Sequence, residues 1–314
     1  MSRAILDDLR LPEPEFHLHV GSGSHAEQTG QVMMAYEKVC FEHRPDWIVV
    51  VGDVNSTAAC AMVGAKLWIP VVHLEAGLRS RDRRMPEEIN RLVTDAISDV
   101  LWTPSEDADE NLMQEGVDPQ KIDLVGNIMI DSFEMLRDQI EQSTARADLS
   151  ISEPYALVTL HRPSNVDAID DFRPIVDALA KTSAKIPLVF VAHPRTMKSL
   201  DAMSLSDELC SSGSVNLIDP VPYVDFMNLV TGASLVITDS GGLQEETTYL
   251  GIPCITLREN TERPITVTNG TNKLGDAESL SQLVDEALGD SWPRGSCPPL
   301  WDGKTAERAV ACLR

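Results

Sequence analysis

The sequence predicts an α/β fold made of two doubly wound, Rossmann-like domains that bind a ligand in the cleft between them. Its 314 residues are 43% hydrophobic, which is enough for about two cores at roughly 100 to 200 residues per domain. Short apolar runs alternate with helical patterns along most of the chain. These runs are apolar at successive positions, as expected for strands of a parallel sheet with helices on both faces.

The first half shows this alternation from about residue 46. Between Gln142 and Pro154 the composition changes to Ser, Ala, Asp and Glu without an apolar face, which predicts a surface linker or a loose helix end. We therefore expect domains at residues 1–148 and 149–314. The predicted elements of the first half are strand Trp47–Val51, helix Ser56–Leu67, strand Pro70–Leu74, a helix from Pro86, strand Val100–Thr103, helix Ser105–Glu115, strand Ile122–Val125 and helix Met129–Ile140.

The second half repeats the pattern, and its last segment, Trp292–Arg314, predicts a loop and a final helix that packs back on the first domain. Ligands of such sheets bind beyond the carboxyl ends of the strands. The predicted elements are strand Ala156–Leu160, helix Phe172–Thr182, strands Leu188–Ala192 and Val215–Ile218, helix Tyr223–Val230, strand Leu235–Thr238, a helix from Gly242, strand Cys254–Leu257 and helix Ala277–Leu288.

Composition excludes several classes of function. The 26 basic and 49 acidic residues give a formal charge of −23, which argues against nucleic-acid binding and against binding to anionic membranes. No apolar run approaches the roughly 18 to 20 residues of a membrane span, and the opening residues resemble no signal peptide. Six scattered cysteines without a CxxC predict reduced thiols and no metal site. We expect a cytoplasmic protein without membrane insertion.

The strongest local signal is a strand that runs into a Ser-Gly-Gly turn, Ser240, Gly241 and Gly242, at the start of a helix. Glycines let a phosphate approach the backbone, and the first N–H groups of the helix favour an anion. A capping box with Ser240 as N-cap explains the turn equally well. Glu246 lies one and a half turns into this helix, within reach of a ribose hydroxyl.

Basic side chains follow other predicted strands of the second half. His161 and Arg162 end one strand, and His193 and Arg195 end the next, which favours an anionic ligand at this edge. Arg263 precedes a proline on restricted backbone, where its guanidinium is held with little mobility. A surface ion pair of Arg263 with Glu259 or Glu262 is the alternative.

Three carboxylates of the first half belong to neighbouring segments. Asp53 and Glu75 each follow a predicted strand, and Glu87 opens a helix with Arg91 four positions later. Clustered carboxylates raise one another's pKa, which supplies an acid and a base near neutral pH. Taken singly, Asp53 also fits a helix N-cap, and Glu87 also fits complementation of the helix dipole together with an ion pair with Arg91.

The ordered motifs GDVNST, HLEAGLRSRDRRMPEEINR, VGNIMID, TLHRPSNVD, TDSGGLQEE and ENTERP resemble those of the non-hydrolysing UDP-N-acetylglucosamine 2-epimerase family, over about residues 20 to 263. The resemblance implies the two-domain glycosyltransferase-B architecture. It also implies interconversion of UDP-GlcNAc and UDP-ManNAc, or of a close UDP-2-acetamido sugar, with no cofactor. The reaction eliminates UDP to give a 2-acetamidoglucal and then adds UDP back.

The resemblance also assigns roles. Asp53, Glu75 and Glu87 handle the proton, His161 contacts the diphosphate or the sugar, and Arg91 orients the sugar. The remaining substrate contacts are Arg263 on the diphosphate or the sugar, Ser240 and Gly241 on phosphate, Glu246 on ribose, and the Phe226 backbone on uracil. Gly242 and Arg195 complete the substrate-binding set.

The chain departs from the family pattern at its start. Family members begin with a strand, a Gly-x-Arg-Pro turn, a helix and a second strand, whereas Met1-Ser2-Arg3 resembles the interior of that pattern. We therefore expect a first domain that lacks on the order of 30 residues or more, and a homodimer that covers exposed sheet edges. Two alternatives to epimerisation are hydrolysis to ManNAc and UDP, and UDP-sugar binding by a truncated, catalytically impaired protein.

Overall fold

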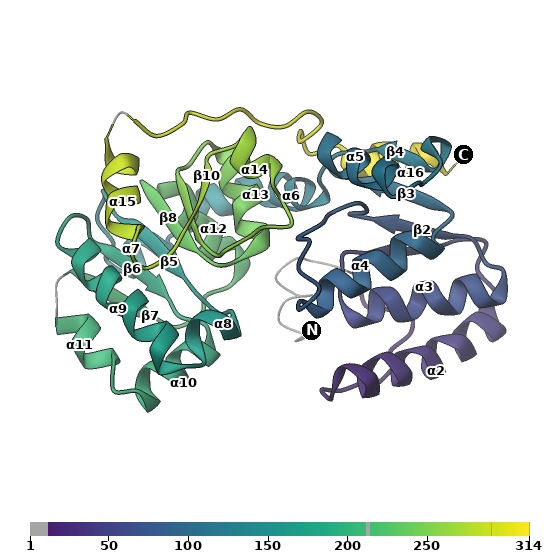
Figure 1. The fold of residues 1–314 in the computed structure, drawn as a ribbon, viewed down its shortest axis with the longest axis horizontal. Helices are drawn as coiled ribbons and strands as arrows, with labels where there is room; N and C mark the ends of the chain where they lie inside the picture. Colours follow the sequence, from purple (N-terminus) through teal and green to yellow (C-terminus); the bar gives the residue numbers. More distant parts are fainter. Residues whose placement is uncertain (1–11, 212–213, 290, 314) are drawn as a thin grey trace. The chain divides into compact units, whose positions relative to one another are not determined.

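Two separate parallel sheets confirm the predicted α/β class (Figure 1). The computed structural model describes residues 12–211, 214–289 and 291–313, so the first residues of the chain, on which the predicted departure from the family pattern rests, lie outside the described part. The described chain divides into an N-terminal unit, residues 12–131 with 299–313, and a C-terminal unit, residues 132–298. The division falls inside α6, earlier than residue 148.

The N-terminal unit contains a four-stranded sheet in the order β1-β2-β3-β4, in which every pair is parallel. Its strands are β1 (Ile48–Val51), β2 (Val71–Leu74), β3 (Val100–Thr103) and β4 (Ile122–Leu124), and its helices are α2 (His25–His43), α3 (Asn55–Leu67), α4 (Pro86–Ile97), α5 (Glu106–Gln114), the 3₁₀ turn η1 (Pro119–Lys121), the start of α6 (Ile128–Gln142), and α16 (Thr305–Cys312).

Alternating residues of β1 and β2 reach different helices. Ile48 and Val50 pack in one cluster with Cys40 of α2 and Ala61 of α3, whereas Val72 of β2 packs with residues of α16. Val49 and Val51 face the same side as Val72 but stay 45% and 47% exposed. The prediction of a strand apolar on two buried faces is therefore wrong for β1, because no described helix covers Val49 and Val51.

Residues 299–313 belong to the N-terminal unit through polar contacts. Trp301 Nε1 donates to the Pro104 carbonyl at 2.8 Å. The Asp131 carboxylate accepts from the backbone N–H groups of Thr305 and Ala306, at 3.0 and 2.7 Å, and so caps α16. Arg308 Nε donates to the Val125 carbonyl at 2.5 Å. These contacts place the final helix beside β3 and β4.

The C-terminal unit contains a six-stranded parallel sheet in the order β10-β9-β8-β5-β6-β7. Its strands are β5 (Ala156–Thr159), β6 (Leu188–Val191), β7 (Val215–Ile218), β8 (Leu235–Thr238), β9 (Cys254–Leu257) and β10 (Asn272–Gly275). Its helices, besides the rest of α6, are α7 (Ala145–Asp148), α8 (Pro163–Val166), α9 (Ile169–Ser183), α10 (Pro194–Ala202), α11 (Ser206–Ser211), α12 (Tyr223–Gly232), α13 (Gly241–Leu250), α14 (Ile265–Thr268) and α15 (Leu280–Leu288).

This sheet is buried on both faces. Ala156 and Val158 of β5 pack in a cluster with α9 and α15, whereas Leu157 between them packs in a second cluster with α6 and α12. The strand order reverses between the neighbours β5 and β8, from which the chain winds outward in both directions. Such a switch point leaves room for a ligand beyond the carboxyl ends of the strands.

The segment 142–154, predicted as a surface linker or a loose helix end, begins at the end of α6 and lies mostly at the surface, but the division between the units falls before it. It contains α7, and Arg146 of this helix donates to the Asn228 side chain of α12 at 3.3 Å. Ser143 Oγ donates to the Asp225 carboxylate, also on α12, at 2.6 Å. These partners lie 82 positions away in the sequence, so local composition gave no sign of them. Among the described residues, none of the helices combines the length and the apolarity that a membrane crossing needs.

Candidate active site

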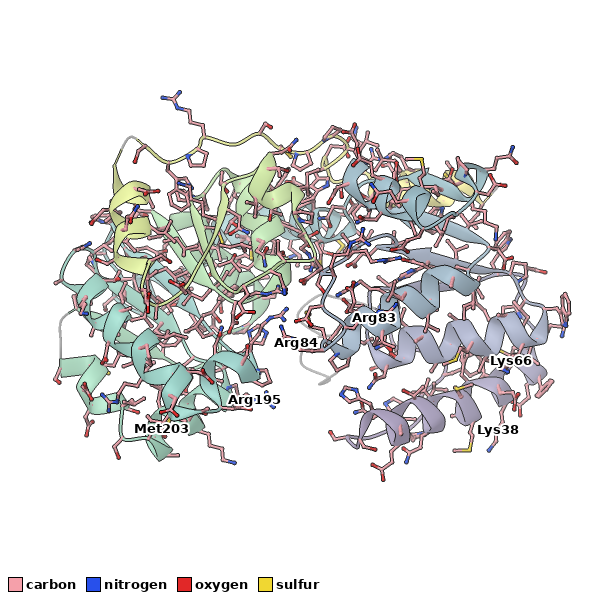
Figure 2. The ribbon with its side chains drawn as sticks, viewed as in Figure 1. Lys38, Lys66, Arg83, Arg84, Arg195 and Met203 are labelled. Carbon is pink, nitrogen blue, oxygen red and sulfur yellow. The ribbon has the colours of Figure 1, made fainter. Side chains whose placement is uncertain are left out.

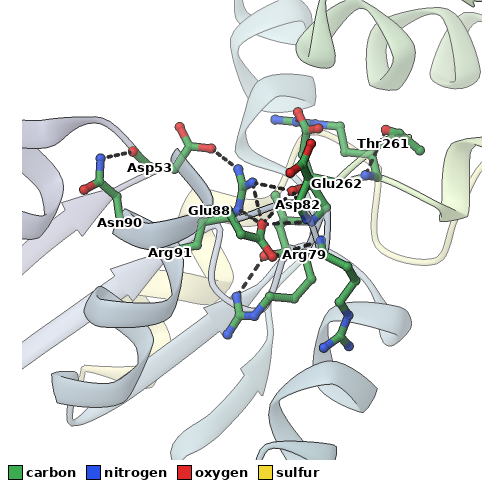
Figure 3. A network of polar contacts seen from close by, with 12 residues as sticks. Asp53, Arg79, Asp82, Glu88, Asn90, Arg91, Thr261 and Glu262 are labelled. Atoms are coloured by element: carbon green, nitrogen blue, oxygen red, sulfur yellow. Dashed lines mark hydrogen bonds and ion pairs between the residues drawn. The ribbon is translucent and has the colours of Figure 1, made fainter. Parts of the chain in front are cut away.

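Asp53, just after β1, contacts Arg91 of α4 (Figure 3). The Arg91 side chain is only 1% exposed, and its guanidinium also donates to Glu88 Oε2 at 2.7 Å. The Asp53 carbonyl accepts from Asn90 Nδ2 at 2.9 Å. Helix α4 therefore holds Asp53 by both its backbone and its carboxylate, while 28% of the Asp53 side chain stays open to solvent.

Two alternatives from the sequence are wrong. The N-cap position of α3 belongs to Val54, so Asp53 does not cap this helix. Arg91 pairs with Glu88 and not with Glu87, because Glu88 is buried and also accepts from the Ser80 backbone N–H at 2.9 Å. Burial alone would raise the pKa of Glu88, but the Ser80 and Arg91 contacts lower it below its usual value.

Glu75 follows β2 directly, and it is half-buried. Its backbone has φ +70°, in the left-handed region that residues other than glycine seldom adopt. This conformation costs on the order of 1 to 3 kcal/mol and tends to occur where a side chain is aimed for function. The carboxyl ends of β1 and β2 thus carry one predicted proton-handling residue each, on adjacent strands.

Glu87 lines a pocket of about 410 Å³ at the start of α4. The pocket walls carry three amide side chains and one imidazole, and Asn55 Nδ2 donates to Gln28 Oε1 at 2.8 Å. Such groups recognise the hydroxyl and acetamido substituents of a sugar. The other lining residues are Val20, Gly21, His25, Gln28, Val32, Val54, Asn55, Ser56, Pro86 and Asn90.

An ionic cluster that was not predicted joins the buried side chains of His73, Arg79 and Asp95 to the partly exposed Glu115. Asp95 contacts the His73 ring at 2.6 Å and Arg79 at 2.7 Å, and Arg79 also pairs with Glu115 at 2.8 Å. The pKa of Asp95 is lowered, because His73 and Arg79 outweigh the effect of burial. The spacing of Glu88, Arg91 and Asp95 in α4 was the available signal, since it places three charges on one helix face.

In the C-terminal unit, Asp239 organises the switch point. Asp239 directly follows β8, is fully buried, and accepts from the backbone N–H groups of His161 and Arg162 at 3.1 and 2.9 Å. Its carboxylate also contacts His161 Nδ1 at 3.0 Å. These donors lower the pKa of Asp239 although burial opposes them. The His161 side chain, 41% exposed, is thereby held at the sheet edge.

The turn Ser240-Gly241-Gly242 lies at this same edge. Ser240 occupies the N-cap position of α13, but its hydroxyl makes no capping hydrogen bond. The predicted capping box is therefore wrong, since Leu243, and not a Glu or Gln, is three positions on. A Cβ atom at Gly241 would lie 2.6 Å from both Arg263 Nη1 and Glu262 Oε1, so a larger residue would require these two side chains to shift.

Arg263 is 9% exposed and pairs with two carboxylates, Glu262 Oε1 at 2.5 Å and Glu245 Oε2 at 2.7 Å. The predicted alternative named Glu262 correctly as a partner but was wrong in placing the pair on the surface. Burial would raise the pKa of Glu262, but Arg263 and Arg258 outweigh it and hold the value well below the usual range. The guanidinium is thus fixed beside Gly241.

Glu246, on α13, is 5% exposed and accepts from the Tyr223 hydroxyl at 2.7 Å. Burial raises the pKa of Glu246 to about 7. The hydrogen bond from Tyr223 opposes this rise, and the nearby charge of Glu245 adds to it. Phe226 is half-buried on α12, and its backbone N–H donates to the Pro222 carbonyl at 2.8 Å. A buried carboxyl group and a half-buried aromatic residue therefore lie on neighbouring helices of one unit.

Arg195 lies at the start of α10 with its side chain 46% exposed (Figure 2). Its backbone N–H donates to His193 Nδ1 at 3.2 Å, so His193 caps α10. The rings of His193 and His161 are 5.8 Å apart, at the ends of neighbouring strands. Within the described ranges, no group of three or more His, Cys, Asp or Glu side chains is arranged to hold a metal ion.

Comparison with known proteins identifies the family. The family model for UDP-N-acetylglucosamine 2-epimerase matches residues 1–314. The UDP-N-acetylglucosamine 2-epimerase of Methanocaldococcus jannaschii is 43% identical over 100% of this chain and 87% of the relative. The UDP-2,3-diacetamido-2,3-dideoxy-D-glucuronate 2-epimerase of Pseudomonas aeruginosa is 39% identical over 91% of this chain and 79% of the relative.

Solved structures give the same result. The M. jannaschii UDP-GlcNAc 2-epimerase in complex with UDP-GlcNAc and UDP superposes with a TM-score of 0.90, at 43% identity, over 98% of this chain and 86% of that one. The Neisseria meningitidis UDP-GlcNAc 2-epimerase bound to UDP-GlcNAc gives 0.88, at 27% identity, over 99% and 89%. The chain therefore belongs to the UDP-N-acetylglucosamine 2-epimerase family.

Proposed function

We propose that this protein is an isomerase that interconverts UDP-GlcNAc and UDP-ManNAc, or the two C2 epimers of a close UDP-2-acetamido sugar. A base removes the proton from C2 while the C1–O bond to UDP breaks, which leaves a 2-acetamidoglucal and free UDP. An acid then returns a proton to C2 on the opposite face, and UDP adds back to C1. Atoms and charge balance without a redox partner.

The observation that carries this proposal is the Asp53 carboxylate, fixed by Arg91 at a strand end next to the strand that bears Glu75. Proton transfer at carbon needs an acid and a base held in fixed positions. Asp53, Glu75 and Glu87 supply three carboxyl groups from two strand ends and one helix start. We assign proton handling to these three carboxyl groups. Arg91 fixes the orientation of Asp53 and also orients the sugar.

The C-terminal unit supplies the grip on departing UDP. The N–H groups of the Ser240-Gly241-Gly242 turn and the Arg263 guanidinium suit a phosphate anion. His161, which Asp239 orients, faces the diphosphate or the sugar, and Arg195 adds a positive charge at the neighbouring strand end. Glu246 accepts from a ribose hydroxyl, and the Phe226 region contacts uracil.

Incubation with UDP-GlcNAc tests the activity. The expected result is a stable mixture of UDP-GlcNAc and UDP-ManNAc, reached at the same composition from either side and unchanged in rate by EDTA. Accumulation of free ManNAc and UDP instead identifies a hydrolase. UDP binding without turnover identifies a nucleotide-sugar-binding protein.

We further propose a cytoplasmic homodimer. Val49 and Val51 expose apolar side chains on one face of β1, which is an end strand of the four-stranded sheet, and an exposed apolar face beside an end strand favours coverage by a second chain. Light scattering during gel filtration measures the mass directly. A monomeric mass at micromolar concentration contradicts the dimer.

A further inference from the structure

His73 connects the segment Gly52–Asp53, after β1, to the ionic cluster of Arg79, Asp95 and Glu115. It lies in β2, is fully buried, and places its two ring nitrogens against two different oxygen atoms. Nδ1 is 2.6 Å from Asp95 Oδ1, and Nε2 is 2.8 Å from the Gly52 carbonyl oxygen. Gly52 directly precedes Asp53 in the chain.

Both oxygen atoms are acceptors. A backbone carbonyl never donates, so the Gly52 contact requires a proton on Nε2. The other oxygen of Asp95 accepts from the Gly77 N–H at 3.1 Å and pairs with Arg79 at 2.7 Å, as expected of an ionised carboxylate. The Asp95 contact therefore requires a proton on Nδ1 as well. In a neutral ring, one nitrogen carries a lone pair instead of a proton, and this lone pair would face one of the two acceptor oxygens repulsively.

The surrounding charges accommodate a cation on this ring. Asp95 faces it from α4, and the further groups of the cluster and of the Asp53 site are Arg79, Arg91, Asp53, Glu88 and Glu115. Arg81 also lies 3.5 Å from Glu115, so without a charge on His73 this set and Arg81 together hold three cations and four anions. A buried imidazolium paired to Asp95 reduces that excess.

We propose that His73 is a doubly protonated imidazolium that positions Asp53 for proton transfer by holding the Gly52 carbonyl. The Gly52 N–H donates to the Leu74 carbonyl at 3.0 Å, so β2 holds the Gly52 residue from both its N–H and its C=O. Three side chains then hold the segment Gly52–Asp53. His73 contacts the Gly52 carbonyl, Asn90 donates to the Asp53 carbonyl, and Arg91 contacts the Asp53 carboxylate. His73 is a positioning residue, and this part of the inference rests on the proposed function.

The charge state is measured by ¹⁵N NMR of the histidine rings in the intact protein at about pH 7. We expect both nitrogens of one ring to carry a proton, and we expect Asp95→Asn to abolish that signature. The exposed ring of His43 serves as the internal reference. A His73 ring with one unprotonated nitrogen at neutral pH overturns the proposal, whatever the enzyme activity.

Two substitutions separate the contacts. In His73→Gln the side-chain amide nitrogen takes the place of Nε2 and donates to Gly52, whereas in His73→Asn it takes the place of Nδ1 and donates to Asp95. We expect His73→Asn to lower kcat on the order of 10- to 100-fold with KM little changed, and His73→Gln to retain most of kcat. Equal kcat in the two variants overturns the positioning role.

Stability is measured on both variants, because each loses one buried hydrogen bond and a purely structural role lowers both Tm values without separating their kcat values. If both variants unfold, the NMR signature of the wild-type ring still decides the charge state. A wild-type protein that fails to epimerise contradicts the proposed function and leaves the protonation result intact.

Discussion

The Arg91 guanidinium of α4 contacts the Asp53 carboxylate 38 positions earlier in the sequence, at the end of β1. Arg91 is shielded from solvent, whereas Asp53 remains partly open. The contact therefore connects a rigid, buried helix face to a carboxylate that a ligand can reach. This arrangement fixes the orientation of Asp53 before substrate arrives.

Asp53→Asn keeps the size of the side chain but removes its charge and its basicity. We expect kcat to fall by about 100- to 10,000-fold, the usual contribution of a general acid or base, while UDP binding stays near wild type. Steady-state kinetics and calorimetric titration with UDP measure the two quantities. Asp46→Asn, on the exposed segment before β1, is the matched control. Normal turnover in Asp53→Asn rules out a proton-handling role.

Glu75→Gln tests the second carboxylate. The substitution preserves volume and hydrogen-bonding capacity but cannot accept a proton from carbon, so we expect loss of turnover with UDP affinity nearly intact. The exposed Glu110→Gln on α5 controls for the loss of one surface charge. If Glu75→Gln turns over at the wild-type rate, Glu75 does not belong to the acid and base set.

Arg263→Ala removes the cation shared by Glu245 and Glu262. Both buried carboxylates then lose an ion pair, although Glu262 keeps Arg258, so we expect folding stability to fall by about 3 kcal/mol. We also expect UDP binding to weaken by about 1.5 to 3 kcal/mol, through loss of a charge-assisted hydrogen bond. Urea unfolding and calorimetry measure these effects separately.

Arg263→Lys accompanies this variant, because lysine keeps the charge but not the bidentate guanidinium geometry. We expect it to recover part of the stability and less of the UDP affinity. The exposed Arg294→Ala is the control for charge. Wild-type UDP affinity in folded Arg263→Ala contradicts the assignment of this residue to the diphosphate.

The raised pKa of Glu246 predicts that the stability of the protein depends on pH. Its pKa is about 7 in the folded protein and 4.5 in the reference state, so the folded form binds the proton more tightly. Below about pH 4.5 the group is protonated in both states and does not affect the folding free energy. As pH rises from about 4.5 to about 7, the native state loses stability. The loss is on the order of 3 kcal/mol above that window.

Glu246→Gln is neutral throughout and still accepts the Tyr223 hydrogen bond. Relative to wild type, we expect the variant to gain stability between about pH 5 and about pH 8, as measured by urea unfolding at both pH values. A difference that does not change with pH shows that Glu246 is not perturbed. The same variant binds UDP more weakly if Glu246 holds the ribose.

Sequence patterns were most successful for the strands. Val100–Thr103, Val215–Ile218, Leu235–Thr238 and Cys254–Leu257 match the structure at both ends, since strands of a parallel sheet are short, largely apolar and bounded by polar residues, even where, as in β7, they are only partly buried. Helix starts were less accurate; α15 begins at Leu280 and not at Ala277, because Asp276 and Ser279 form a local turn first.

For the candidate site, the sequence located some residues and missed others. Residues at strand ends, such as Asp53, Glu75, His161 and Ser240, were accessible from sequence because parallel strands carry their functional residues at the carboxyl edge. Residues that act through other residues were missed. Asp239 and Asp95 depend on partners that the fold brings together from distant segments; the spacing in α4 marks a charged helix face that includes Asp95 but does not reveal its contact with His73.

The most direct test of the proposed function is proton NMR of the protein with UDP-GlcNAc in D₂O. Elimination and re-addition require exchange at C2, so we predict that deuterium enters at C2 as the UDP-ManNAc anomeric signal appears. UDP-GlcNAc that remains unchanged, with no deuterium at C2 although UDP binds, contradicts the account.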